Sequence, residues 1–195
     1  EALGERLAAA PLASPFTPEV VVASSPAMAR WVNLGLARRD GVAANVDYPL
    51  PASFVWRLAA DLLDGLPEAD PLALEVTAWK VFGLLPPLLE APAFAPLARY
   101  LEGDADGLKR WQLAGRIADV LDRYQLYRPE LIRAWDAGDE AHDWQAELWR
   151  RLTAGVEDTH RVAVIGRLLA VLGGPAPAAV PQRVSVFAVS SLPPL

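Results

Sequence analysis

The chain has 195 residues, of which 53% are hydrophobic and 22% are charged, and its formal net charge at pH 7 is −6. This composition excludes a largely disordered chain and a polycationic nucleic-acid binder, so any contact with DNA would come from a local cluster of side chains or from partners. Cysteine is absent, which excludes disulfides and thiolate metal sites.

The first forty residues are predicted to form a helix, a buried strand and a second helix. Residues 1–10 have the pattern of a chain already inside a helix, and 11–18 form a loop with three prolines. The run 19–24 (EVVVAS) is short, apolar and β-branched, as in a strand buried on both faces of a parallel sheet. One of the two serines at its end is expected to cap a helix over about 27–38.

The next stretch has a different rhythm. Residues 42–48 alternate weakly between apolar and polar types, and Pro49 and Pro51 then break the chain. Ser53 is expected to cap a helix with an apolar stripe that runs to about Leu63.

Only helices are predicted from there to about residue 172. The segment 72–90 is apolar all round, which predicts burial, and Pro86 and Pro87 are expected to kink or end it. The clearest amphipathic pattern covers 108–127. Its predicted apolar face consists of Leu113, Ile117, Val120, Leu121 and Tyr124. Shorter helical patterns cover 94–103, 128–138, 142–156 and 160–174.

The C-terminal part returns to strand character. A linker rich in Gly, Pro and Ala over 173–182 is followed by a second buried-type strand over 183–191. The sequence therefore predicts an α/β fold with few parallel strands and a large, mostly helical insertion. We expect residues 1–50 and 174–195 to form the α/β part and 51–173 to form the inserted helical subdomain.

Motifs for nucleotide hydrolysis are absent. A phosphate loop needs a glycine-flanked lysine, but the only lysines are Lys80 and Lys109, outside any such motif. The strand at 183–191 would be the place for a Mg²⁺-binding Asp-Glu pair, yet residues 182–195 contain no carboxylate. The chain is therefore predicted to be non-catalytic.

The sequence gives equally little support for a serine nucleophile, a zinc site or a membrane span. The chain has no GxSxG nucleophile elbow, and His142 and His160 lack the spacing of zinc ligands. The acidic runs 102–107 and 136–143 are interpreted as solvated loops between helices. No apolar run reaches the roughly 20 residues of a membrane span, so no membrane contact is expected.

Six of the seven tryptophans fall under two interpretations. Trp79, Trp135, Trp144 and Trp149 lie in helical patterns with apolar neighbours, which predicts packing in the core or at an interface. Trp31 and Trp56 each follow a proline-marked turn near a basic residue, and for these two base stacking is the alternative to packing.

Several stretches, taken in order from about Phe16 to Leu195, resemble one family. The most specific are NVDYPLPASFVW (45–56) and DRYQLYRP (122–129). The others are Met28, Ala29 and Trp31 after the first strand, AWKVFGLLPPLLE (78–90), WQAELWRRL (144–152) and VSVFAVSSLPPL (184–195). In this order they are similar to the N-terminal region of the exodeoxyribonuclease V gamma subunits, the RecC family of RecBCD helicase–nuclease complexes.

The resemblance implies a degenerate superfamily 1 helicase fold, in which domain 1A is P-loop NTPase-like but its ATPase motifs have decayed. In that frame, the first strand corresponds to the one that carries the motif after the P-loop. The P-loop strand itself is expected before Glu1. ATP and Mg²⁺ are then expected to be cofactors of the partner subunits, with none in this chain.

The role implied by the resemblance is to guide the 3′-tailed single strand toward the nuclease and to scan it for a Chi recombination hotspot. The expected partners are single-stranded DNA and the beta and alpha subunits, in the cytoplasm, during recombinational repair of double-strand breaks. Carried over by position, the DNA-binding residues are Ser24, Pro26, Arg30, Leu50, Trp56, Asp119, Val120, Asp122, Arg123 and Arg161. Enterobacterial members have Gln, Thr and Gln at the first three, so a different base preference is expected.

Two alternatives stay open. One is an active ATP-dependent helicase domain whose P-loop lies upstream of Glu1. The other is a helical protein-interaction scaffold, in which Asp119 and Arg123 form an ordinary surface ion pair four residues apart on one helix.

Overall fold

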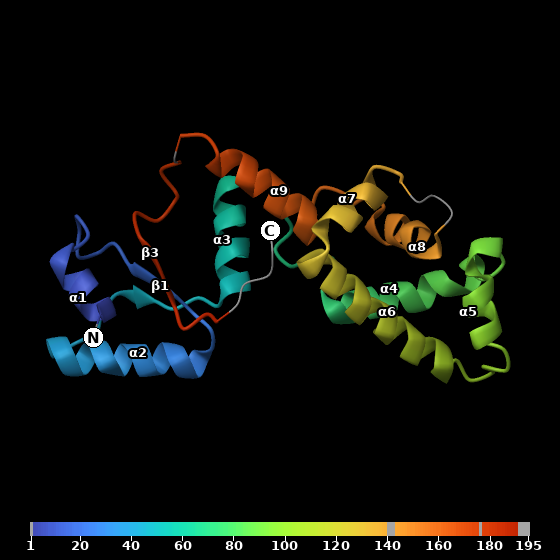
Figure 1. Ribbon diagram of the computed structural model, residues 1–195, viewed down its shortest axis with the longest axis horizontal. Helices are drawn as coiled ribbons and strands as arrows, with labels where there is room; N and C mark the ends of the chain where they lie inside the picture. Colours follow the sequence, from blue (N-terminus) through green and yellow to red (C-terminus); the bar gives the residue numbers. More distant parts are fainter. Residues whose placement is uncertain (1, 140–142, 176, 191–195) are drawn as a thin grey trace. The chain divides into compact units, whose positions relative to one another are not determined.

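The computed structural model describes residues 2–139, 143–175 and 177–190 (Figure 1). Its contacts divide the chain into two compact units. In the described residues, the first comprises 2–64, 171–175 and 177–190, and the second comprises 65–139 and 143–170. The first unit extends to residue 64, whereas the sequence placed the start of the helical insertion at 51.

The first unit is built on a parallel sheet of three strands in the described residues, in the order β2-β1-β3. The central strand β1 (Glu19–Ala23) pairs with β2 (Val46–Asp47) on one side and with β3 (Val184–Phe187) on the other. Strand β3 is shorter than the strand predicted over 183–191, and β2 was not predicted as a strand. The side chains from Val20 to Ala23 are between 0 and 6% exposed, which confirms a strand buried on both faces.

Helices α2 (Pro26–Asp40) and α3 (Pro51–Leu62) cover opposite faces of this sheet. Asp47 is in register with Val20 and pairs with Arg57 of α3, with 2.6 Å between Nη2 and Oδ2. Phe187 is in register with Ala23, which points to the other face, and its ring stacks on Trp31 of α2. Since successive residues of a strand point to opposite faces, Val20 and Ala23, three residues apart, face opposite ways, and the two contacts assign one helix to each face.

Helix α1 (Ala2–Ala9) precedes this sheet, and Arg183 ties the two together. The Arg183 guanidinium donates to the Glu19 carboxylate and to the carbonyl oxygen of Ala10. This ion pair joins the beginning of β3 to the beginning of β1 across 164 residues of sequence. It therefore fixes where the chain re-enters the sheet.

The described residues of the second unit form helices joined by loops, without a strand. Its elements are α4 (Leu74–Leu88), the 3₁₀ helix η1 (Pro92–Phe94), α5 (Ala95–Tyr100), α6 (Leu108–Tyr127), α7 (Pro129–Asp136), α8 (Trp144–Thr153) and the start of α9 (Arg161–Leu172). Helices α4 and α6 pack along each other, and a core of buried aliphatic side chains and the rings of Phe94, Trp135 and Trp149 joins them to α7, α8 and α9. Burial of Trp135 and Trp149 confirms their predicted packing.

Two local expectations are wrong. Ser53 lies inside α3, whose N-cap is Leu50 without a side-chain bond, because Pro51 at the first position already sets a helical φ angle. Val120 was placed on the apolar face of α6 but is 38% exposed. The expected end of α4 at its two prolines is confirmed, because Pro86 and Pro87 lie in its last turn and the helix ends at Leu88.

Helix α4 is also less buried than its all-round apolar sequence suggested. Trp79 is 62% exposed, and Leu74 and Val76 are exposed as well.

Among the described residues, no single helix combines the length and hydropathy to cross a membrane. The segments Leu74–Leu88 and Pro92–Tyr100 meet those criteria only as a pair, with a bend of 118° between them.

Candidate nucleic-acid interface

Five of the DNA-binding residues implied by the resemblance belong to the first unit, around the carboxyl end of its sheet. Ser24 follows β1 directly, and Leu50 is the residue before α3. The backbone N–H of Ala23 donates to the carbonyl oxygen of Pro49 at 3.1 Å, which places the two turns side by side. In parallel α/β sheets, ligands are generally bound at this edge.

The turn after β1 is held by its own backbone. Ser25 is the N-cap of α2, and its Oγ accepts from the N–H of Met28 at 3.2 Å. Pro26 occupies the first helical turn, where it lacks an N–H to offer a ligand. Ser24, Pro26 and Arg30 are all exposed, so the turn presents a hydroxyl and a guanidinium to solvent.

Two tryptophans of this unit have different surroundings. Trp56 lies in α3 and is half-buried. Trp31 lies in α2 and is 65% exposed, although its ring stacks on Phe187 with 6.0 Å between centroids. Trp31 therefore offers more free ring surface for a base than Trp56, the residue that the resemblance selects.

The other five residues belong to the second unit, where the structure joins four of them in two ion pairs. Arg161, the first residue of α9, places its Nη1 3.1 Å from Oδ1 of Asp122 on α6. Its Nη2 lies 3.6 Å from Oδ2 of Asp70, in the loop before α4. Asp70 was not predicted, since a lone aspartate in a loop carries no local signal for a partner so distant in sequence.

The remaining three lie on the outer surface of α6. Arg123 and Asp119 form an ion pair of 2.9 Å, with side chains 65% and 40% exposed. Such an exposed pair, four residues apart on one helix, contributes little stability and leaves both groups available to a ligand. Val120 beside them is also exposed.

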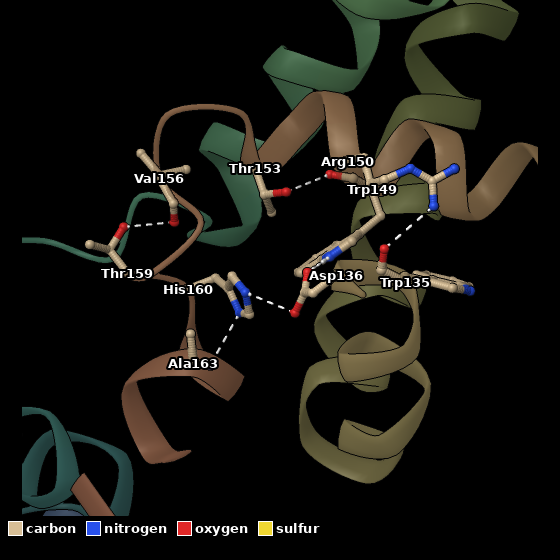
Figure 2. Close-up of polar contacts among 9 residues, drawn as sticks. All are labelled: Trp135, Asp136, Trp149, Arg150, Thr153, Val156, Thr159, His160 and Ala163. Carbon is tan, nitrogen blue, oxygen red and sulfur yellow. Dashed lines mark hydrogen bonds and ion pairs between the residues drawn. The ribbon is translucent and has the colours of Figure 1, made fainter. Parts of the chain in front are cut away.

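Next to Arg161, the buried side chains of Trp149 and His160 contact Asp136, whose own side chain is 35% exposed (Figure 2). His160 is 1% exposed, and its Nε2 lies 3.3 Å from Oδ2 of Asp136. Trp149 donates from Nε1 to the other carboxylate oxygen at 2.7 Å, and its ring meets the imidazole edge to face at 5.2 Å. Burial raises the pKa of Asp136, but the hydrogen bonds from His160 and Trp149 outweigh this effect, so the pKa lies below its ordinary value.

An exposed aromatic cluster on α4 and α6 also went unpredicted. The rings of Trp79 and Trp111 lie 4.3 Å apart, and each contacts Phe82. The guanidinium of Arg110 lies over Phe82 at 4.1 Å. The sequence assigned Trp79 to packing because apolar residues surround it in the chain, and that pattern does not distinguish a core from an uncovered surface.

Two carboxylates of the acidic runs act as helix caps. Asp104 accepts from the backbone N–H groups of Lys109 and Arg110 at 2.9 Å each, at the start of α6. Asp143 caps α8 by accepting from Gln145 at 2.7 Å. Within the described residues, no three His, Cys, Asp or Glu side chains gather in a way that could hold a metal ion. His142 lies outside the described residues.

A family model described as RecC, N-terminal domain, matches residues 1–195. The RecBCD enzyme subunit RecC of Escherichia coli K12 is 36% identical over 94% of this chain and 18% of its own length. The subunit of the same name from Haemophilus influenzae is 33% identical over 99% of the chain and 20% of its own length. That of Mycolicibacterium smegmatis is 29% identical over 94% and 17%, so the chain spans about a fifth of these relatives.

Proposed function

The chain belongs to the RecC family, whose N-terminal domain it matches along its whole length, and from this premise we propose that it is a non-catalytic, DNA-guiding part of a RecBCD-type helicase–nuclease complex. In this proposal the domain contacts the 3′-terminated single strand on its way to the nuclease. It also contributes to recognition of a hotspot sequence in that strand and docks onto the partner subunits.

The observation that carries the proposal is the chemistry at the carboxyl edge of the sheet. Nucleotide-binding α/β proteins bind phosphates here through a glycine-rich loop and a lysine. In this chain the turn after β1 carries Ser24, Pro26 and Arg30, all exposed. An exposed hydroxyl and guanidinium suit a phosphate or base edge of a single strand, and they supply no group for ATP hydrolysis.

The second unit supports the same role with complementary chemistry. Carboxylates such as Asp119 and Asp122 accept from the amino group of cytosine, and Arg123 and Arg161 donate to guanine or phosphate. Selective recognition of bases needs both donors and acceptors, and α6 and α9 supply both. The degenerate P-loop relationship of the sheet, the supply of ATP and Mg²⁺ by partner subunits and a cytoplasmic location are parts of this proposal.

A matched pair of arginines on one helix tests the proposal. Arg30 and Arg38 are both exposed on α2, Arg30 as its fifth residue and Arg38 in its last turn. In the assembled complex with full-length subunits, we expect Arg30→Ala to alter where the 3′-terminated strand of a blunt duplex is cut. Arg38→Ala should leave the cut positions unchanged, and both variants should hydrolyse ATP at the unaltered rate. Identical cut positions for Arg30→Ala and the unaltered complex would count against a guiding role for this turn.

A further inference from the structure

We propose that Asp136, Trp149 and His160 form a positioning clamp for Arg161. The clamp fixes the first turn of α9 and thereby holds the Arg161 guanidinium between Asp122 and Asp70. That Arg161 then contacts DNA rests on the proposed function. The positioning itself depends only on contacts within the second unit.

The hydrogen bonds of His160 determine where its proton lies. The backbone N–H of Ala163 donates to Nδ1 of His160 at 3.4 Å, so Nδ1 is an acceptor and the proton of the neutral ring is on Nε2. Nε2–H then donates to Asp136. The imidazole therefore links the N-terminus of α9 to α7, with each ring nitrogen serving one partner (Figure 2).

The two residues at the start of α9 are adjacent in sequence but differ in burial. The N–H of Val164 donates to the carbonyl oxygen of His160 at 3.0 Å, which makes His160 the N-cap residue of the helix. Arg161 follows at the first helical position, with its side chain 26% exposed. Because the imidazole is fixed in the core, the backbone of the next residue is held in place as well. The direction in which the Arg161 side chain leaves the helix is therefore fixed.

Arg161 needs such support because its location is electrostatically unfavourable. The N-terminus of a helix carries a partial positive charge, so a cation in the first turn is repelled. Asp122 and Asp70 offset this repulsion, but their side chains are only 33% and 22% exposed and act at fixed positions, Asp122 on α6 and Asp70 in the loop before α4. A small rotation of the first turn of α9 would move the guanidinium out of reach of both carboxylates.

An isosteric change breaks the clamp without a cavity. In Asp136→Asn, the amide has one acceptor facing two donors, Nε2–H of His160 and Nε1–H of Trp149. If the imidazole carries its proton on Nδ1, that proton faces the N–H of Ala163, and this N–H then has no acceptor. In every amide orientation and either tautomer, one buried donor loses its acceptor. His160→Asn is the complementary variant, since asparagine still caps a helix but is too short to reach Asp136.

The test measures the reactivity of Arg161 toward an arginine-selective dicarbonyl, phenylglyoxal, in the assembled complex of full-length subunits, by peptide mass spectrometry. Arg151, 61% exposed on α8, is the internal reference. We expect Asp136→Asn and His160→Asn each to raise Arg161 modification about tenfold over the reference, the equivalent of one hydrogen bond to a charged group.

The matched control is Thr153→Val, which removes a buried hydroxyl that donates to the Trp149 carbonyl at 3.0 Å on the same helix. This variant removes a bond to the backbone of Trp149 but leaves the side-chain contacts among Asp136, Trp149 and His160 in place, so Arg161 reactivity should stay at the unaltered level. Equal rises in Thr153→Val and Asp136→Asn would overturn the proposal, since general loosening would then explain both. Unchanged reactivity in either clamp variant would overturn it too.

A second arm adds a single-stranded oligonucleotide of mixed sequence to the unaltered complex. If Arg161 contacts DNA, the oligonucleotide should protect it from phenylglyoxal, and protection should be lost in Asp136→Asn. A rise in Arg161 reactivity in the clamp variants without DNA, together with no protection by DNA, would support the clamp and contradict the proposed DNA contact of Arg161. The two failures are thus distinguishable.

Discussion

The two regions of the candidate interface are built in different ways. The turn after β1 is held by backbone and cap, and among the described residues no ion pair engages its Arg30. The junction at the start of α9 is held by side chains from α6, α7, α8 and the loop before α4. The first region therefore depends on local sequence, whereas the second depends on the packing of a whole unit.

The largest difference is expected for two tryptophans, one in each region. Trp149→Ala removes a side chain that is 1% exposed and opens a cavity, which should cost about 4 kcal/mol in the free energy of opening of the second unit. Trp31→Ala removes a side chain that is 65% exposed, and should cost about 1 kcal/mol or less. Hydrogen exchange of the full-length protein, resolved by peptide, measures both. A similar loss of stability in Trp149→Ala and Trp31→Ala would contradict the difference between the two regions.

The clamp should also give the second region a pH dependence. Because the folded pKa of Asp136 lies below its ordinary value, the stabilising effect of its ionised form is fully present above that ordinary value and is lost as the pH falls through the lower folded pKa. Asp136→Asn should destabilise the second unit by about 1–2 kcal/mol at neutral pH. The gap between the variant and the unaltered protein should narrow as the solution is acidified below the ordinary pKa. A constant gap in acid-titrated unfolding would show that the carboxylate charge has no part in the clamp.

In the first region, the N-cap Ser25 should contribute more to stability than the neighbouring Ser24. Ser25→Ala removes the side-chain acceptor for the N–H of Met28 and should cost about 1 kcal/mol. Ser24→Ala is the matched control, because Ser24 is exposed and is not the N-cap, so its effect on stability should be close to zero. Amide exchange in the first turn of α2 distinguishes the two serines. Faster exchange in Ser24→Ala than in Ser25→Ala would reverse their assigned roles.

The smallest effect is expected on the outer face of α6. A double-mutant cycle of Asp119→Ala and Arg123→Ala should give a coupling energy of about 0.5 kcal/mol or less, since both side chains are largely exposed. The coupling should decrease further with added salt. A coupling above about 2 kcal/mol would mean that the pair is structural and not free to bind a ligand.

The comparison also explains how much the sequence reveals. Three features follow from local patterns. A β-branched run predicts strand β1, a serine after the strand predicts the N-cap of α2, and apolar residues with a period of 3.6 predict the helices of the second unit. The contacts of Arg161 do not, because Asp70 and Asp122 approach it only after α4, α6 and α9 have packed. Likewise, nothing local indicates that His160 is buried against Asp136.

The central claim is that this domain touches the single strand through both regions, and photo-crosslinking tests it most directly. A blunt duplex carries 4-thiothymidine at successive positions of its 3′-terminated strand and is processed by the assembled complex of full-length subunits before irradiation. We predict crosslinked peptides that contain residues 24–30 of the first unit and 119–123 or Arg161 of the second. Crosslinks confined to the partner subunits, with normal unwinding of the duplex, would contradict the account.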